Sequence, residues 1–148
     1  MASSISLEYL NSITPGNTAA FCAQNRVGST IAVILLGTAI PLASMIYNNG
    51  FSANASNTQF TVQRTGVYHI SYKINVTAAA LLSASVYKNG TAMSELSQVA
   101  AISLSSYACE AIVSLTQGDV LQLTFYGLLG TAVLSSGVGA VLMGMQIA

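Results

Sequence analysis

The chain has 148 residues but only four basic and four acidic side chains, which give a net charge of zero. This length suits one domain with a substantial core, whereas about a quarter of the residues in such a domain are normally charged. The basic residues form no cluster (Arg26, Arg64, Lys73 and Lys88), which argues against a nucleic-acid-binding surface. Residues 120–148 carry no charge at all. We therefore expect apolar surface that is covered either by lipid or by other copies of the chain.

The apolar segments are poorly suited to crossing a membrane. The run from Thr30 to Ile40 ends at Pro41 and falls well short of the roughly 20 residues that a spanning helix needs. The uncharged tail is long enough, but glycines interrupt it repeatedly between Gly127 and Gly144. Each glycine costs a helix interior roughly 1 kcal/mol. We expect no membrane span, and self-association instead.

The first 28 residues differ in pattern from the rest. Residues 4–9 alternate between polar and apolar side chains, as in a short strand, and a polar, turn-rich stretch follows at 11–17. Residues 18–28 are mostly small and polar. We expect residues 1–28 to form a strand-like N-terminal assembly arm with its linker, and residues 29–148 to form one domain. The apolar residues of the arm are the candidates for contact with a neighbouring copy: Ile5, Leu7, Tyr9, Leu10 and Ile13.

In the body of the chain the dominant period is two, which is typical of strands with one buried face. After a strand at 59–63, residues 68–76 place alternate apolar side chains on one side: Tyr68, Ile70, Tyr72, Ile74 and Val76. The alternation continues through residues 82–86 to Asn89-Gly90, a strong hairpin signal because both central residues need positive φ.

Residues 107–115 repeat this pattern from Tyr107 to Leu115, and the turn at 117–119 leads into a strand that carries Leu121, Leu123 and Phe125. A last strand carries Val141, Met143, Met145 and Ile147. Many short strands with Gly and Asn turns, and no convincing helix, predict an all-β antiparallel sandwich or barrel.

No group of residues suggests catalysis. His69 is the only histidine, which leaves no multi-histidine metal site in one chain. The four acids are scattered, and no Gly-x-Ser-x-Gly elbow is present. We expect neither an enzyme nor a cofactor or metal. Cys109 is in phase with the apolar face of its strand and is expected to be a small buried residue. Cys22 lies in the linker and is the candidate for a disulfide between subunits.

Three segments of the body, at 60–72, 87–90 and 113–123, carry a resemblance to a known superfamily. In this order they resemble the jelly-roll heads of the tumour necrosis factor and complement globular-head superfamily. Residues 78–82 and 127–130 are closer still to the C-terminal heads of the collagen-like glycoproteins of the bacterial spore surface, the exosporium.

The resemblance implies an antiparallel two-sheet jelly roll that assembles as a homotrimer about a threefold axis, on the exterior of a spore. Within such a trimer, the strands that carry Tyr72, Tyr107 and Tyr126 are the candidates to line the axis. The chain departs from the family in one respect, because it contains no Gly-X-Y stalk. The alternating tip and linker stand where that stalk would be.

Two functions remain open at this point. The first is a structural subunit, whose trimers stack into a filament or layer through their N-terminal arms and contact copies of themselves or other spore-coat or exosporium proteins. The second is a ligand- or receptor-binding head, for which the loops at 47–51 and 94–101 offer Tyr47, Phe51 and Glu95.

Overall fold

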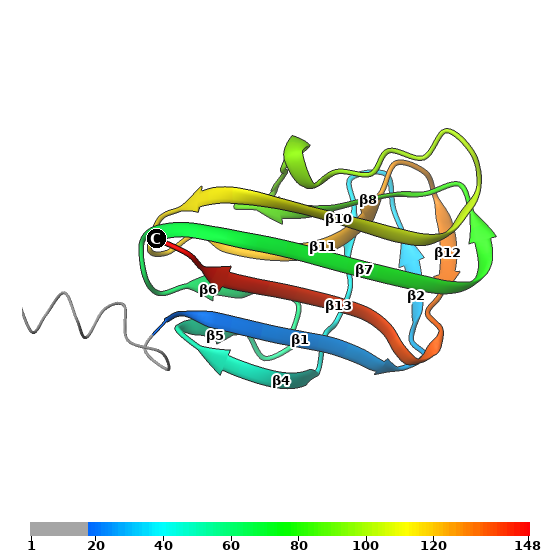
Figure 1. Ribbon diagram of the computed structural model, residues 1–148. Coiled ribbons are helices and arrows are strands. Elements are labelled where there is room, and N and C mark those ends of the chain that lie inside the picture. The colour runs from blue at the N-terminus through cyan, green and yellow to red at the C-terminus, as the bar shows by residue number, and fades with distance from the viewer. Residues whose placement is uncertain (1–17) are drawn as a thin grey trace, which may run out of the picture.

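Two antiparallel sheets packed face to face build the protein (Figure 1). The computed structural model describes residues 18–148. The first sheet has five strands in the order β10 (Leu104–Leu115), β7 (Gly66–Ala80), β13 (Ser136–Gln146), β1 (Ala20–Val27) and β4 (Ser44–Asn49). The second has the order β5 (Phe51–Ala53), β6 (Phe60–Val62), β11 (Val120–Tyr126), β8 (Ser83–Lys88) and β9 (Thr91–Ala92), with β3 (Thr38–Ala39) paired to β11. The predicted all-β, two-sheet antiparallel architecture is confirmed.

Two further elements complete the described residues. A small two-stranded sheet pairs β2 (Thr30–Val33) with β12 (Gly130–Val133). A short 3-10 turn, η2 (Ser94–Leu96), follows β9 and leads toward β10. Main-chain hydrogen bonds join this connection to the second sheet, since Ala84 and Gln98 exchange bonds of 3.0 and 2.8 Å.

The core lies between the sheets and follows the predicted alternation. On β7 the inward side chains of Tyr68, Ile70, Tyr72 and Ile74 are at most 3% exposed. They face β11, whose residues Leu121, Leu123 and Phe125 are fully buried. Aromatic rings reinforce one end of this core, where the ring of Phe21 lies 4.4 Å from that of Phe51 and 5.2 Å from that of Phe60.

Residues 20–27 were expected in the linker but form β1, an interior strand of the five-stranded sheet. Residues 20–25 pair with β13 on one side, and residues 20–24 pair with β4 on the other. The predicted boundary between linker and domain, at residue 28, therefore lies after the first strand of the domain instead of before it. The period-two signal is weak here because, of the inward residues Phe21, Ala23 and Asn25, only Phe21 is both large and apolar. The arm residues Ile5, Leu7, Tyr9, Leu10 and Ile13 lie outside the described residues.

The predicted last strand is present as β13, and it turns its small residues toward the core. Ala140 and Leu142 are fully buried, and Gly144 is buried with them. A Cβ atom added to Gly144 would lie 2.9 Å from Cε1 of Phe21 and 3.0 Å from Cδ1 of Ile70. Because the core has no room here, the larger side chains of Met143 and Met145 project from the opposite face of the sheet.

The predicted Asn-Gly hairpin joins β8 to β9. Asn89 and Gly90 have φ values of 53° and 85°, as this tight turn requires. The Asn89 side chain also secures the neighbouring strand, because its Oδ1 accepts from the backbone N–H of Val120 at 2.9 Å and its Nδ2 donates to Asp119 at 3.0 Å.

The two ends of the sandwich are distinct. Ala20 at the start of β1 pairs with Met145 near the end of β13, so the described chain begins beside the C-terminus (Figure 1). We call this the arm end. The opposite, distal end holds the start of β8 and the end of β11, where Ser83 pairs with Tyr126. The start of β1 and any surface at the distal end are thus separated by the length of the strands.

The buried tyrosines predict a loss of stability at alkaline pH. Burial raises the pKa of Tyr68, Tyr72 and Tyr107 above the ordinary value of about 10. Above that pH the unfolded chain releases these protons before the folded chain does. The contribution of each tyrosine is therefore fully present below pH 10 and falls as the pH rises from the unfolded to the folded pKa, by at most about 1.4 kcal/mol per pH unit. Urea unfolding between pH 8 and 11 should show this decline, with a smaller slope in Tyr107→Phe. A midpoint independent of pH would contradict it.

Candidate assembly surfaces

The outer face of the five-stranded sheet carries a band of side chains that cross all five strands. At its centre, Met143 on β13 lies between Ser71 on β7 and Cys22 on β1. Beyond Cys22 comes Tyr47 on β4, and beyond Ser71 comes Glu110 on β10. Directly opposed residues of a sheet point to the same side, so this whole row faces away from the core.

The next row lies one step closer to the arm end. Here Met145 is flanked by His69 on β7 and Ala20 on β1, and Ile112 on β10 lies beyond His69. Both rows thus combine large apolar side chains with small or polar ones, Ser71 and Glu110 in the first and His69 in the second. We define the sheet patch by the exposed large side chains of these two rows: Tyr47 (50% exposed), Ile112 (64%), Met143 (43%) and Met145 (51%).

A shallow groove of about 170 Å³ lies within the sheet patch. Its walls come from four different strands and include Cys22, Tyr47, His69, Met143 and Met145. Contiguous apolar surface of this kind on a folded domain marks a site of protein–protein contact or ligand binding. Thioether side chains adapt their shape readily, which suits a contact surface.

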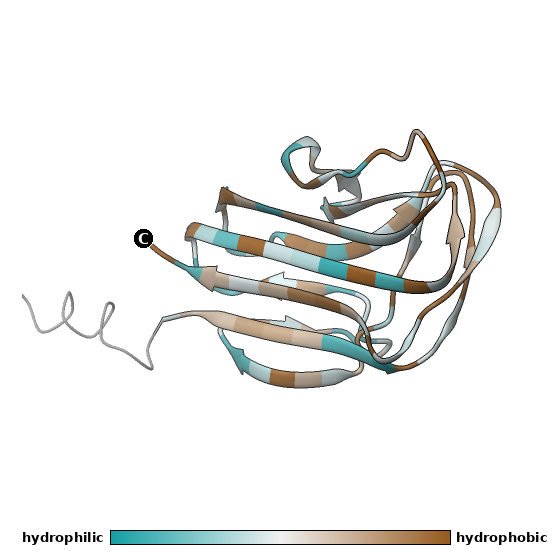
Figure 2. Ribbon diagram, turned by 45° about the vertical axis from the view of Figure 1, so that its right-hand side comes forward, coloured by the Kyte–Doolittle hydropathy of each residue, from teal (hydrophilic) through white to brown (hydrophobic). Residues whose placement is uncertain are grey.

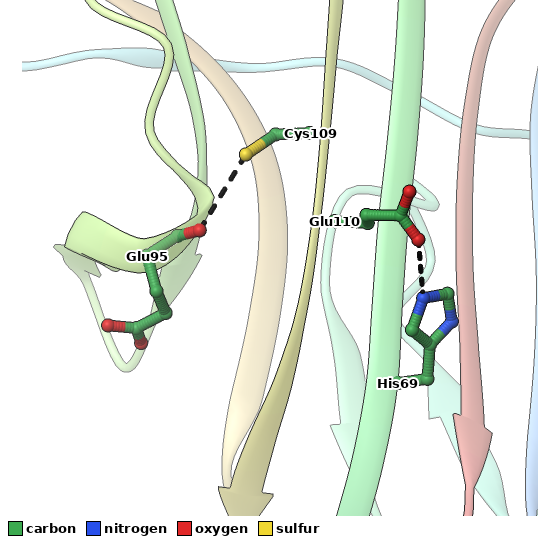
Figure 3. A network of polar contacts seen from close by, with 4 residues as sticks. All are labelled: His69, Glu95, Cys109 and Glu110. Carbon is green, nitrogen blue, oxygen red and sulfur yellow. Dashed lines mark hydrogen bonds and ion pairs between the residues drawn. The ribbon is translucent and has the colours of Figure 1, made fainter.

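A polar pair borders the patch on the β10 side. Figure 3 shows the carboxylate of Glu110 reaching from β10 to His69 on β7, with Oε1 2.8 Å from Nε2. The side chain of the adjacent Cys109 points to the other side of β10, where its Sγ lies 3.6 Å from the carbonyl oxygen of Glu95 in η2. Cys109 is only half-buried, but it packs against the core as expected.

Cys22, the candidate for an intersubunit disulfide, lies inside the sheet patch. Its thiol is free and half-buried, and burial raises its pKa. Thiol–disulfide chemistry proceeds through the thiolate, so this environment slows oxidation at neutral pH. The disulfide therefore stays a prediction, and the position of Cys22 on this face restricts its partner to a chain seated on the patch.

The three tyrosines predicted to line a trimer axis do not lie on the sheet patch. Tyr72 and Tyr107 are 3% and 0% exposed and belong to the core of a single chain. The hydroxyl of Tyr72 donates to the carbonyl of Leu96 at 2.8 Å, inside the protein. Tyr126 is half-buried on the second sheet, where its ring packs edge-on against Tyr87. Because Tyr72 and Tyr107 fill the space between the sheets, they have no surface to offer to a partner.

A second apolar surface occupies the distal end of the sandwich (Figure 2). It is formed by loops that carry none of the charged residues of the chain. We define the distal patch by its exposed side chains: Leu35 (58%), Leu36 (86%), Leu81 (44%), Val99 (73%), Leu128 (45%) and Leu129 (72%). Sequence reasoning missed this surface because the residues come from four separate loops, and no periodic pattern connects them.

The structure offers less support for the other candidate sites. Phe51, proposed as an exposed loop aromatic, is 3% exposed and packs in the core. Within residues 18–148 no group of three or more His, Cys, Asp or Glu side chains is arranged to hold a metal ion. In the same part of the chain no helix has the length and apolar character of a membrane span. The two apolar patches are therefore the surfaces that a function must explain.

Residues 21–148 match the family model of the BclA C-terminal domain. The chain belongs to this family. The match begins inside β1 and covers both sheets, so the BclA C-terminal domain comprises the two-sheet body described above. The resemblance to the heads of spore-surface collagen-like glycoproteins is thereby confirmed. A search of curated protein sequences finds no significant match.

Solved structures with the same fold include jelly-roll heads from animals. The globular domain of zebrafish complement 1qA is 14% identical, with a TM-score of 0.62, and covers 88% of this chain and 98% of its own. Murine APRIL at pH 8.0 is 13% identical, with a TM-score of 0.61 and coverages of 88% and 99%. The Eiger TNF from S. frugiperda is 13% identical, with a TM-score of 0.59 and coverages of 88% and 93%. At these identities the likeness shows the fold, and it confirms a TNF-like jelly roll for this BclA C-terminal domain.

Proposed function

We propose that this BclA C-terminal domain is a non-enzymatic structural subunit of the spore surface. Three copies associate through the sheet patch, and the trimers polymerise through the N-terminal arm into a filament or layer. The spore location is inferred from the family. The observation that carries the proposal is the sheet patch itself, because Met143 and Met145 present apolar surface at the centre of a flat sheet where a water-exposed protein would place polar side chains.

A second copy of the chain is the simplest cover for this patch. The protein has too few charges to keep such surfaces apart in solution. In a closed ring of three, one surface of each subunit contacts a different surface of the next subunit. The same contact, made three times, closes the ring. His69 and Glu110 beside Met145 and Ile112 then supply the polar groups that set the register of the contact.

The arm supplies a different contact. Its alternating apolar residues suit addition to a neighbouring unit as a strand or plug. Burial of Ile5, Leu7 and Tyr9 contributes roughly 1.5–3 kcal/mol each, and ordering the arm offsets much of that gain. Three arms that leave one trimer bind together, so linkage strengthens the contact without new interactions.

The adhesion alternative has weaker support. Of the side chains it would use, Phe51 is buried, and Tyr47 belongs to the sheet patch. Glu95 on η2 remains exposed, but one carboxylate does not make a recognition site.

Deletion of residues 1–15 tests the coupling role of the arm. All described strands and the core lie within residues 18–148, so the shortened chain is expected to fold and to form soluble trimers. Negative-stain microscopy should show polymers for the full chain and none for the shortened chain. Polymers that persist after the deletion would rule out coupling through the arm.

A further inference from the structure

The distal patch lies at the opposite end of the sandwich from the start of β1, the strand that follows the arm in sequence. β7 runs from Gly66 at the arm end to Ala80 at the distal end, and its 15 residues span about 45–50 Å. Figure 2 shows brown loop segments at the end of the sandwich opposite the labelled C-terminus. A unit with an attaching segment at one end and an apolar surface at the other is built for head-to-tail contact.

Hydrogen bonds at Ser83 and Gly127 hold the patch in shape. The buried Ser83 at the start of β8 accepts from the backbone N–H of Ala100 through its Oγ, at 3.2 Å. Gly127, beside Ser83, donates its N–H to the carbonyl of Leu35 at 3.4 Å. The loops at 34–37, 99–100 and 127–129 therefore meet at Ser83 and its neighbour Gly127. A preformed surface binds without a large ordering cost.

A tight turn presents the most exposed part of the patch. The N–H of Gly37 donates to the carbonyl of Ile34 at 3.0 Å, and Gly37 has a φ of 114°. Leu36 at the tip is 86% exposed, although its carbonyl accepts from the hydroxyl of Tyr87 at 3.3 Å. The backbone of the turn is thus anchored, while its leucine side chains point outward and are left more than half exposed by residues 18–148.

We propose that the distal patch is the acceptor for the N-terminal arm of the next copy. The inference rests on the proposed function and names the surface that the arm binds. The chemistry matches, since Ile5, Leu7, Tyr9 and Ile13 share one phase of an extended arm and the patch offers uncharged aliphatic side chains. In an extended arm the charge of Glu8 falls in the opposite phase to Leu7 and Tyr9, so it points away from the patch.

A second molecule is needed to supply the full contact. Leu10 lies nine residues before Ala19 and reaches at most about 30 Å from the start of β1, whereas Ile5, fourteen residues before Ala19, reaches about 46 Å. Of the apolar residues of the arm only Ile5 could therefore span the length of β7 within its own chain, and the others require the distal patch of another copy. Arm and patch at opposite ends form a contact that does not close on itself, and such contacts generate filaments.

Leu129→Glu in the full chain tests the proposal, with Val99→Glu as a second variant. Both side chains are more than 70% exposed, so the variants are expected to fold and to form trimers. Their polymers should require a protein concentration at least about tenfold higher, because a carboxylate would be buried in the contact. Ala55→Glu is the control, since Ala55 is exposed in the turn between β5 and β6 and belongs to neither patch. It should polymerise as the unchanged chain does.

Mixing provides a second measurement. Trimers of the shortened chain, residues 16–148, keep the patch but lack the arm, whereas trimers of Leu129→Glu keep the arm but lack a working patch. Each should fail to polymerise alone, and together they should form pairs of trimers that grow no further, as measured by sedimentation velocity. In such a pair, the arms of the Leu129→Glu trimer occupy the distal patches of the shortened trimer.

The outcomes separate the two proposals. If Leu129→Glu and Val99→Glu polymerise like the unchanged chain while the shortened chain does not, the arm couples trimers at another surface and the distal patch is not its acceptor. The same conclusion follows if the patch binds neutral lipid vesicles and its variants lose only that binding. If the full chain and the shortened chain polymerise equally, the proposed function itself is wrong.

Discussion

Met143→Glu is expected to split the trimer into folded single chains. Met143 lies at the centre of the sheet patch, between Ser71 and Cys22, and a carboxylate placed there would be buried without a partner on assembly. An uncompensated charge in such a contact costs about 3–5 kcal/mol, which weakens each subunit contact by roughly a hundredfold to several thousandfold. Light scattering across a dilution series would measure the change.

Leu129→Glu is the control for Met143→Glu. It introduces the same charge on the distal patch and should leave the trimer intact. Circular dichroism should be unchanged in both variants, because Met143 and Leu129 are exposed in a single chain. A trimer of Met143→Glu that resists dilution as the unchanged trimer does would exclude the sheet patch from the subunit contact.

Tyr72→Ala is expected to lower the free energy of unfolding by about 3–5 kcal/mol. The side chain fills the space between the sheets, and its hydroxyl bonds the carbonyls of Leu96 and Ala84 at 2.8 and 3.3 Å. The truncation leaves a cavity and removes the hydroxyl donor from the carbonyl of Leu96, while the carbonyl of Ala84 keeps the N–H of Gln98. Urea unfolding of the variant and of the unchanged protein would give the difference directly.

Tyr47→Ala is the matched control, since it removes the same side chain from the sheet patch. Tyr47 is 50% exposed, so the unfolding of a single chain should change by no more than about 0.5 kcal/mol, while association weakens. The opposite pattern, with Tyr72→Ala folded normally but unable to associate, would restore Tyr72 to the subunit contact and remove it from the core.

The contrast between β7 and β1 shows what the sequence could reveal about the fold. On β7 every inward residue from Tyr68 to Val76 is large and apolar, so period two identifies the strand and its buried face together. On β1 the small Ala23 and the polar Asn25 share the inward face with Phe21, and the same test fails. The structure satisfies the buried Asn25 locally, through donation to Ser29 and to the carbonyl of Pro41, both at 2.9 Å.

The assembly surfaces were harder to predict, because hydropathy does not say which partner buries a side chain. On β13 the outward Met143 and Met145 are larger than the inward Ala140 and Gly144, so the apolar pattern marks the surface of the sheet more strongly than its core. Tyr72 and Tyr107 show the opposite case, since they were expected at a subunit contact and are buried within one chain. Tyr72 is in phase with the core residues Ile70 and Ile74, and its phase was a better guide to its position than its residue type.

The most direct test of association through the sheet patch is the mass of residues 16–148 in solution, measured by sedimentation equilibrium at neutral pH. Without the arm, polymer growth does not complicate the result. A single species with three times the mass of one chain, stable to dilution in the micromolar range, is the expected outcome. A species with the mass of one chain at high concentration would show that Met143, Met145 and their neighbours face water, and association through the sheet patch would then be excluded.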